Sequence, residues 1–399
     1  MRGSAVMRAV VRDSTELLVT GPDPAVLRLG LLLPLSGPLG LTGPSGMSAA
    51  CLAATEVNAS GGAAGRGVEL VPVDAGRAPD AVAGEARFLA DAGLVQAFVG
   101  FHTSDVHRGL EAALAGRAPY VFTPPHEGGP RRQGVVLLGD SPERQLGRAL
   151  HWLSARLRLR RWALVGSDYI WPRAVHRAGA RLVREAGGEV VLDRLVPFPW
   201  TAGDDAEPRL EEVVHALARA GAEAILLSLV GRDLAVFNRV FAASRLSAGV
   251  VRLSGALEEN VLLAAGGDDT GELYSAMRSF AGQGDERQLA LAERYRTVFG
   301  EVAPVLDAYA EGCYDGVHLL AALAAAGMLT ARRGRAASAR LLAGADPSRG
   351  APGRPRRSAR RARGATWPGR TAWIWPSSPA SEICEHRTFS FERNASRVR

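Results

Sequence analysis

The stretch at residues 166–173 contains the side chains that most clearly point to ligand binding. It reads Gly-Ser-Asp-Tyr-Ile-Trp-Pro-Arg and brings a hydroxyl, a carboxylate and two large aromatic rings close together. Aromatic walls with a few polar groups suit a small organic molecule, whereas a loop that binds phosphate is usually rich in glycine. The stretch therefore predicts a site for a small organic ligand, with Tyr169 and Trp171 as its aromatic walls.

The surrounding sequence predicts that this stretch connects a strand to a helix. Residues 161–165 end in an apolar run that is typical of a buried strand, and Pro172 suits the first turn of a following helix. In open α/β sheets, ligands bind at the carboxyl ends of the parallel strands, where such loops lie. We therefore expect Tyr169 and Trp171 to border a ligand cleft, and Asp168 to orient the loop rather than to contact ligand.

The same order of apolar run, polar turn and helical segment recurs along the chain. We expect strands at residues 29–33, 68–73, 95–100, 120–122, 163–165 and 224–229, and helices at residues 45–58, 79–92, 285–299 and 308–327. Strands that alternate with helices of this length indicate parallel βαβ units, with helices on both faces of the sheet. The sequence thus predicts an α/β fold built from doubly wound parallel sheets.

Four further candidate ligand contacts, three of them with hydroxyl groups, lie at the ends of two other predicted strands. Thr103 and Ser104 come after the strand that ends at Gly100, and Phe122 and Thr123 lie at the end of the next strand. A hydroxyl at the start of a helix, with the free amide groups of the first turn, can hold a carboxylate or a carbonyl oxygen. The alternative role is that of a helix N-cap.

Glu258 is the candidate for a charged contact with ligand. It lies within Ala-Leu-Glu-Glu-Asn at residues 256–260, where its carboxylate could meet a ligand ammonium or amide N–H group. A capping or solvated carboxylate is the alternative for this residue.

The composition is typical of a globular protein. The chain has 399 residues, of which 47% are hydrophobic and 22% charged, so it can hold two core-forming domains. No apolar stretch approaches the length of a membrane span. The three cysteines, Cys51, Cys313 and Cys384, are far apart and match no metal-binding spacing, so we expect neither a disulfide framework nor a zinc site.

The positive charge of the chain is concentrated at its C-terminal end. Residues 331–399 contain sixteen arginines against four acidic residues, a net charge of +12, so the rest carries −5 of the total of +7. This basic tail is rich in Arg, Ala, Gly, Ser and Pro, which is typical of a disordered extension. The alternative hypothesis is a frameshifted segment, because reading residues 365–376 one base earlier gives a sequence typical of a strand, a turn and a second strand.

The N-terminal residues give no sign of a secretory signal. Charged residues interrupt the first 27 positions, and no sustained apolar run follows them. We interpret residues 1–25 as a disordered extension. The protein as written is expected in the cytoplasm, or outside it if the start position is set incorrectly.

Motifs of two other function classes are not found in the sequence. It contains no nucleophile elbow, no histidine pair at metal spacing and no phosphate loop, and its eight histidines are scattered. We therefore expect no enzyme activity, no catalytic residues, no metal site and no cofactor. A helix-turn-helix would have to precede the first strand, and the first 26 residues are too few for one, so we expect no nucleic-acid partner for the folded body.

Four segments of the chain resemble those of type I periplasmic-binding proteins. They are residues 29–37 (LGLLLPLSG), 98–104 (FVGFHTS), 123–128 (TPPHEG) and 165–173 (VGSDYIWPR). The likeness is greatest to the branch that binds amides, urea and branched-chain amino acids. That branch includes the amide-sensing negative regulator of amidase operons and the leucine-binding-type receptors of ABC transporters. The resemblance covers residues 26–328.

This resemblance implies a clamshell of two doubly wound lobes, joined by three crossings, with a ligand cleft between them. The first lobe would comprise residues 26–138 and 272–328, and the second residues 139–271 with a final segment that is lost or scrambled here. The implied function is non-catalytic binding of a small amide, urea or an amino acid for an ABC permease. The alternative is a cytoplasmic amide sensor that binds a regulatory protein, and an amide-processing enzyme is a third, less favoured interpretation.

The resemblance also bears on the candidate site residues. The family has a serine at the position of Ser104 and aromatic residues at those of Tyr169 and Trp171, which supports all three as ligand contacts. It often has tyrosine where this chain has Phe122 and His126, so we expect a drier pocket here.

Overall fold

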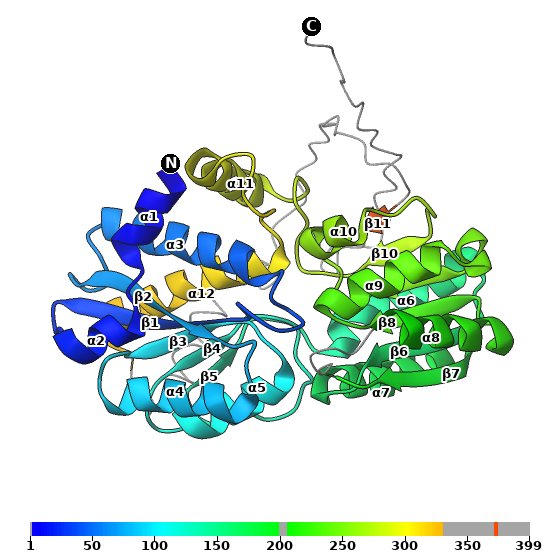
Figure 1. Ribbon diagram of the computed structural model, residues 1–399, viewed down its shortest axis with the longest axis horizontal. Helices are drawn as coiled ribbons and strands as arrows, with labels where there is room; N and C mark the ends of the chain where they lie inside the picture. The colour runs from blue at the N-terminus through cyan, green and yellow to red at the C-terminus, as the bar shows by residue number, and fades with distance from the viewer. Residues whose placement is uncertain (1, 199–205, 330–370, 374–399) are drawn as a thin grey trace, which may run out of the picture.

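The computed structural model describes residues 2–198, 206–329 and 371–373. Figure 1 shows these residues as two α/β lobes side by side. Except for residues 371–373, the basic tail lies outside the described residues, and so do the two interpretations of it.

Each lobe is built on one parallel sheet. The first sheet has the order β2 (Gly67–Asp74), β1 (Val26–Leu33), β3 (Ala97–Gly100), β4 (Tyr120–Phe122), β5 (Val135–Leu137). The second has the order β11 (Thr371–Trp373), β10 (Leu273–Ser275), β9 (Val251–Ser254), β8 (Ala224–Ser228), β6 (Arg161–Ser167), β7 (Glu189–Val196). Neighbouring strands pair in parallel throughout, which confirms the predicted fold class.

Helices cover both faces of each sheet. The first lobe contains α3 (Gly43–Ala59), α4 (Pro79–Asp91), α5 (Ser104–Leu114), α11 (Glu286–Phe299) and α12 (Ala308–Ala325). The second contains α6 (Pro142–Leu157), α7 (Ile170–Glu185), α8 (Ala206–Ala220), α9 (Gly231–Ala242), the 3₁₀ helix η1 (Arg245–Ala248) and α10 (Glu259–Ala265). In Figure 1, α3 and α12 lie on one face of the first sheet and α4 and α5 on the other, and each face has its own apolar core.

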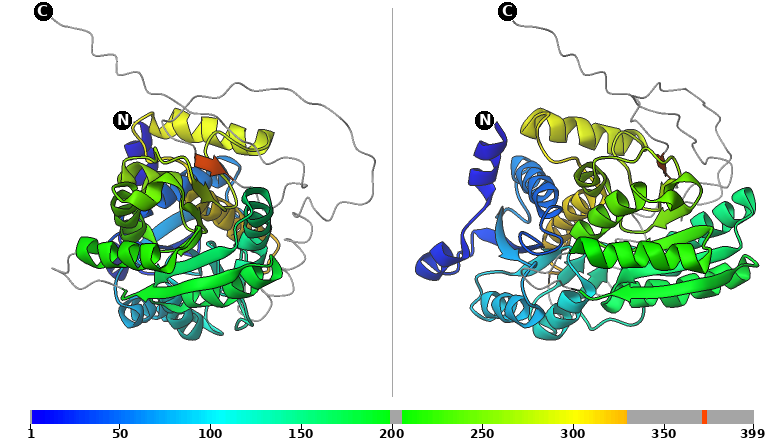
Figure 2. Two further views of the ribbon diagram at one scale, coloured as in Figure 1. Left: turned by 90° about the vertical axis from the view of Figure 1, so that its right-hand side faces the viewer. Right: turned by 45° about the vertical axis from the view of Figure 1, so that its right-hand side comes forward.

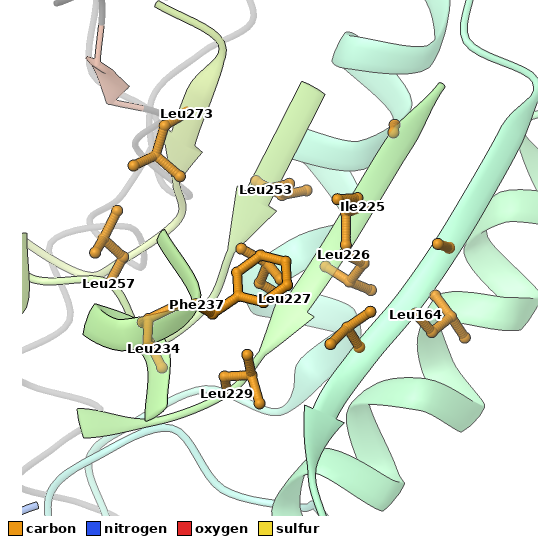
Figure 3. Packing of buried hydrophobic residues seen from close by; sticks show 14 of the residues in the cluster. Leu164, Ile225, Leu226, Leu227, Leu229, Leu234, Phe237, Leu253, Leu257 and Leu273 are labelled. Atoms are coloured by element: carbon orange, nitrogen blue, oxygen red, sulfur yellow. The ribbon is translucent and has the colours of Figure 1, made fainter. Parts of the chain in front are cut away.

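Strands that are buried on both faces explain why the sheets could be found in the sequence. Every residue of β8 is buried, as are seven of the eight residues of β1, and residues 224–227 and 29–33 of these strands are apolar runs. Figure 3 shows Ile225, Leu226 and Leu227 of β8 packed among apolar side chains of neighbouring strands and α9. By contrast, β7 is an edge strand with several exposed side chains, and its sequence shows no such run.

The second lobe extends beyond its expected boundary. The three residues of β10 pair with β9, which places Leu273–Ser275 in the second sheet, whereas the sequence analysis assigned residues 272–328 to the first lobe. A three-residue strand is too short to show a period, so the boundary could not be located from the sequence. The chain crosses between the lobes after β5 and again after β10, and the third expected crossing lies outside the described residues.

The interpretation of residues 1–25 as a disordered extension is wrong. They contain helices α1 (Arg2–Val10) and α2 (Ser14–Thr20), on the side of the first lobe that faces away from the second (Figures 1 and 2). Val10 joins the core on the α3 face of the sheet, and Leu17 joins the core on the opposite face. Because both side chains are buried against the sheet, the segment is part of the first lobe.

Truncation of Leu17 tests this packing. Leu17 is 1% exposed, whereas its neighbour Leu18 is 56% exposed, so the two leucines form a matched pair. We expect Leu17→Ala to lower the free energy of unfolding in urea by about 2–5 kcal/mol and Leu18→Ala by less than about 0.5 kcal/mol. Equal effects of the two substitutions would contradict the packing of α2 on the lobe.

Candidate functional site

The strand order of each sheet leaves a crevice at the carboxyl ends of its central strands. β1 is flanked by β2 on one side and β3 on the other, and β6 is flanked by β7 and β8 in the same way. The loops that follow such strands run to opposite sides, and ligands bind in the gap between them. Both gaps contribute to one cavity of about 30 Å³.

Residues from both lobes line this cavity. Leu39, Phe101, His102, Ser104, Pro124, Pro125 and Tyr309 come from the first lobe, and Tyr169, Trp171 and Val230 from the second. The structure therefore brings together three residues that the sequence analysis named on different lobes, namely Ser104, Tyr169 and Trp171.

Ser104 supplies the aliphatic hydroxyl among the residues that line this cavity. It is the first residue of α5 and is buried, and its Oγ donates a hydrogen bond to Oε2 of Glu127 at 2.9 Å. Oε1 of the same carboxylate forms ion pairs with Nε of Arg108 at 2.7 Å and with a terminal nitrogen of Arg131 at 3.1 Å. Thr103 is the N-cap residue of α5, but its side chain makes no capping hydrogen bond.

Aromatic rings form most of the wall. Tyr169 packs against Phe198 with ring centroids 5.1 Å apart, and Tyr309 stacks on Phe101 at 5.0 Å with the ring planes 11° apart. Trp171 is 4% exposed, and its indole N–H has no hydrogen-bond partner among the described residues. Burial raises the pKa of the Tyr169 hydroxyl well above its usual value, so this group stays neutral.

Four of the residues named from the sequence do not line the cavity: Thr103, described above, and Phe122, Thr123 and Glu258. Phe122 stacks on His107 at 4.0 Å in the core between the sheet and α5. Thr123 is buried beside the cavity, and its Oγ1 donates a hydrogen bond to the carbonyl of Gly100 at 3.3 Å. Glu258 caps α10 by accepting from the amides of residues 260 and 261, and burial raises its pKa well above the usual value. In this structure Glu258 therefore has the capping role that the sequence left open.

Several cavity residues were not named from the sequence. Phe101 and His102 directly follow the end of β3 and precede Thr103. Their position after a parallel strand could therefore have marked them as cavity residues. Tyr309 belongs to α12, which returns to the first lobe long after the other contacts. No local pattern links Tyr309 to Tyr169, because only the fold brings them together.

A directed chain of hydrogen bonds lies behind His102. Arginine has no acceptor, so the contact of Arg131 Nε with Nε2 of His107 at 2.9 Å makes that nitrogen an acceptor. Nδ1 of His107 then donates to the hydroxyl of Tyr120 at 3.0 Å, which donates to Nε2 of His102 at 2.8 Å. Nδ1 of His102 donates in turn to the carbonyl of Thr103 at 3.1 Å. Both histidines are therefore neutral, with the proton on Nδ1.

Burial keeps these histidines neutral. It lowers the pKa of His102 to about 4 and, together with the positive charges of Arg131 and Arg108, that of His107 to about 2. These two histidines therefore carry no positive charge at neutral pH.

Direct contacts hold the two lobes together near the cavity. Ile170, at the start of α7, lies close to the Asp105 carboxylate of α5 across the cleft. The amide of Arg232 donates to the carbonyl of Pro38 at 2.9 Å. Gly231 has φ +51°, and a Cβ there would lie 2.3 Å from the same carbonyl oxygen, so this approach requires glycine.

Across residues 2–198, 206–329 and 371–373, no group of three or more His, Cys, Asp or Glu side chains is placed to hold a metal ion. Over the same ranges, no helix combines the length and apolar character needed to cross a bilayer.

Comparison with known proteins gives a family and a set of similar structures. A family described as periplasmic binding protein matches residues 26–366. The benzoate complex of an ABC-transporter solute binding protein from R. palustris is 20% identical with a TM-score of 0.65, over 77% of this chain and 83% of that chain. The corresponding fatty acid transporter protein from Thermomonospora curvata is 20% identical with a TM-score of 0.67, over 80% and 82%.

A third similar structure is the branched-chain amino acid transporter substrate binding protein from Streptococcus pneumoniae, in complex with isoleucine. It is 19% identical with a TM-score of 0.64, over 79% of this chain and 88% of that chain. At these identities the structures show the shared fold. They confirm the clamshell that the sequence resemblance implied.

The neutral state of His102 predicts a pH dependence of stability. In the unfolded chain this histidine binds a proton below about pH 6.5, whereas in the folded protein it does so only near pH 4. Its contribution is therefore complete above pH 6.5 and is lost as the pH falls toward 4, by on the order of 3 kcal/mol. Urea unfolding between pH 7.5 and 4.5 should show a smaller decline in His102→Gln than in the unmodified protein.

An exposed histidine supplies the control for this measurement. His215→Gln, on the outer face of α8, should leave the decline unchanged. If the three proteins lost stability in parallel, the neutral assignment of His102 would be wrong.

Proposed function

Because the chain belongs to the periplasmic binding protein family, we propose that it is the solute-binding component of an ABC transporter, which closes its lobes on a small ligand. One observation carries this proposal. The cavity lies at the carboxyl ends of both parallel sheets, and each lobe supplies part of its wall. A molecule bound there contacts both lobes at once only when they are closed, so binding shifts the protein toward the closed form.

The size of the cavity indicates that the lobes separate to admit ligand. A volume of about 30 Å³ has room for only a few atoms. The hydrogen bond from Arg232 to Pro38 and the contact between Ile170 and Asp105 would be lost on opening and restored on closing. They add to the stability of the closed form, which is the form that a permease would recognise.

The ligand is proposed to be a small organic molecule, bound without chemical change. Short amides, urea and branched-chain amino acids are the classes that the resemblance implies. The rings of Phe101, Tyr169, Trp171 and Tyr309 favour a ligand with an apolar or aromatic body. Benzoate and isoleucine, which are bound by proteins of similar fold, therefore belong in the same screen.

A thermal-shift screen followed by calorimetry tests the proposal. The screen contains short amides, urea, branched-chain amino acids, benzoate and fatty acids, and at least one class should raise the melting temperature. For that class, Ser104→Ala and Tyr169→Ala should each weaken binding more than tenfold, because each removes a contact from one lobe.

Tyr274→Ala provides the matched control. Tyr274 is in the second lobe and is buried to nearly the same degree as Tyr169, at 8% against 7% exposed, but it lies outside the cavity lining. Its truncation should lower stability and leave affinity within about twofold. Equal affinities for the Ser104, Tyr169 and Tyr274 variants would contradict the proposed site.

A further inference from the structure

Ser104 lines the cavity, and the hydrogen of its hydroxyl group is already donated to a protein acceptor. It lies 2.9 Å from Oε2 of Glu127, and a carboxylate that is paired with two guanidinium groups has no proton to donate. Ser104 is therefore the donor in this bond. Only its oxygen lone pairs remain for a ligand, so Ser104 can accept a hydrogen bond from ligand but cannot donate one.

Glu127 is held in this orientation by its other oxygen. Its side chain is 5% exposed, and Oε1 contacts Arg108 and Arg131 on the side away from Ser104. Arg131 is itself fixed by the carbonyl of Gly128 at 2.7 Å and by His107 at 2.9 Å. One carboxylate oxygen of Glu127 therefore contacts the arginines, and the other accepts the hydrogen bond from Ser104.

The hydrogen-bond donors of the site come from other groups. The first-turn amides of α5 receive no hydrogen bond from the Thr103 side chain, and the buried indole N–H of Trp171 has no partner among the described residues. A ligand that matches this arrangement needs an acceptor for these donors and an N–H or O–H donor for Ser104. A carboxamide has both, whereas a carboxylate has acceptors only.

The charges near the cavity do not decide between a neutral ligand and an anion. The Glu127 carboxylate is compensated by its ion pairs with Arg108 and Arg131, and the histidines behind the wall are neutral. The direction of the hydrogen bonds therefore decides between an amide and a carboxylate.

We propose that Glu127 determines the specificity of the site by making Ser104 an acceptor, which selects neutral ligands with an N–H donor, such as carboxamides, over the matching carboxylates. This inference rests on the proposed function, because it concerns the same cavity. It goes beyond that function in naming a residue outside the cavity lining that sets which ligands bind.

Glu127→Gln should reverse the role of Ser104. Guanidinium groups only donate, so the glutamine oxygen must face Arg108 and Arg131, and its NH₂ group then takes the position next to Ser104. That NH₂ group donates to Ser104 and frees the serine hydrogen for the ligand. The substitution keeps the shape of the side chain and changes the direction of one hydrogen bond.

Calorimetry with two matched pairs, benzamide with benzoate and isobutyramide with isobutyrate, measures this change. In the unmodified protein the amide of each pair should bind at least tenfold more tightly than the carboxylate. In Glu127→Gln this preference should fall at least tenfold. Glu111→Gln is the control, since Glu111 also pairs with Arg108, at 2.9 Å, but makes no hydrogen bond to Ser104. It should leave the preference within about threefold.

The double variant Ser104→Ala with Glu127→Gln separates hydrogen-bond direction from charge. Without the serine hydroxyl, Glu127→Gln should change the preference no more than Glu111→Gln does. Tighter binding of the carboxylates by the unmodified protein, or an unchanged preference in Glu127→Gln, would overturn the inference and leave solute binding intact. Binding of none of the four compounds would also overturn it, and the wider screen would then decide the proposed function separately.

Discussion

The site depends on the direction of the strands. Parallel strands with helical crossovers place the loops that follow them at one edge of the sheet, and the reversals of order at β1 and β6 open a gap at that edge in each lobe. The two edges meet at the cavity, so residues from both lobes face one small volume. The aromatic wall, the Ser104 hydroxyl and the contacts between lobes all follow from this arrangement.

A second layer of buried polar groups determines what the wall can do. Isolated polar side chains at this depth would be unstable, and here each is held by a partner with a fixed direction of donation. Arg131 lies at the centre, because it orients both His107 and Glu127. Through these two residues it sets the neutral state of His102 and the acceptor role of Ser104.

The sequence was sufficient where the local pattern reflects burial. Strands covered on both faces, such as β1 and β8, contain apolar runs at residues 29–33 and 224–227, and the segment with Tyr169 and Trp171 follows a similar run in β6. It was insufficient where a contact depends on distant segments. The burial of Leu17 requires the assembled sheet, and Tyr309 reaches the cavity only because α12 returns to the first lobe. The hydrogen bond from Ser104 to Glu127 joins the first turn of α5 to the loop between β4 and β5, and no spacing in the sequence indicates it.

Closure of the two lobes on a ligand can be measured directly as a distance between them. Spin labels at positions 87 on α4 and 181 on α7, where the arginine side chains are exposed, report on the separation of the lobes once Cys51, Cys313 and Cys384 are replaced. The compound with the largest thermal shift should narrow the distance distribution and shift it to shorter values. A compound that binds tightly and leaves the distribution unchanged would contradict a site shared between the lobes.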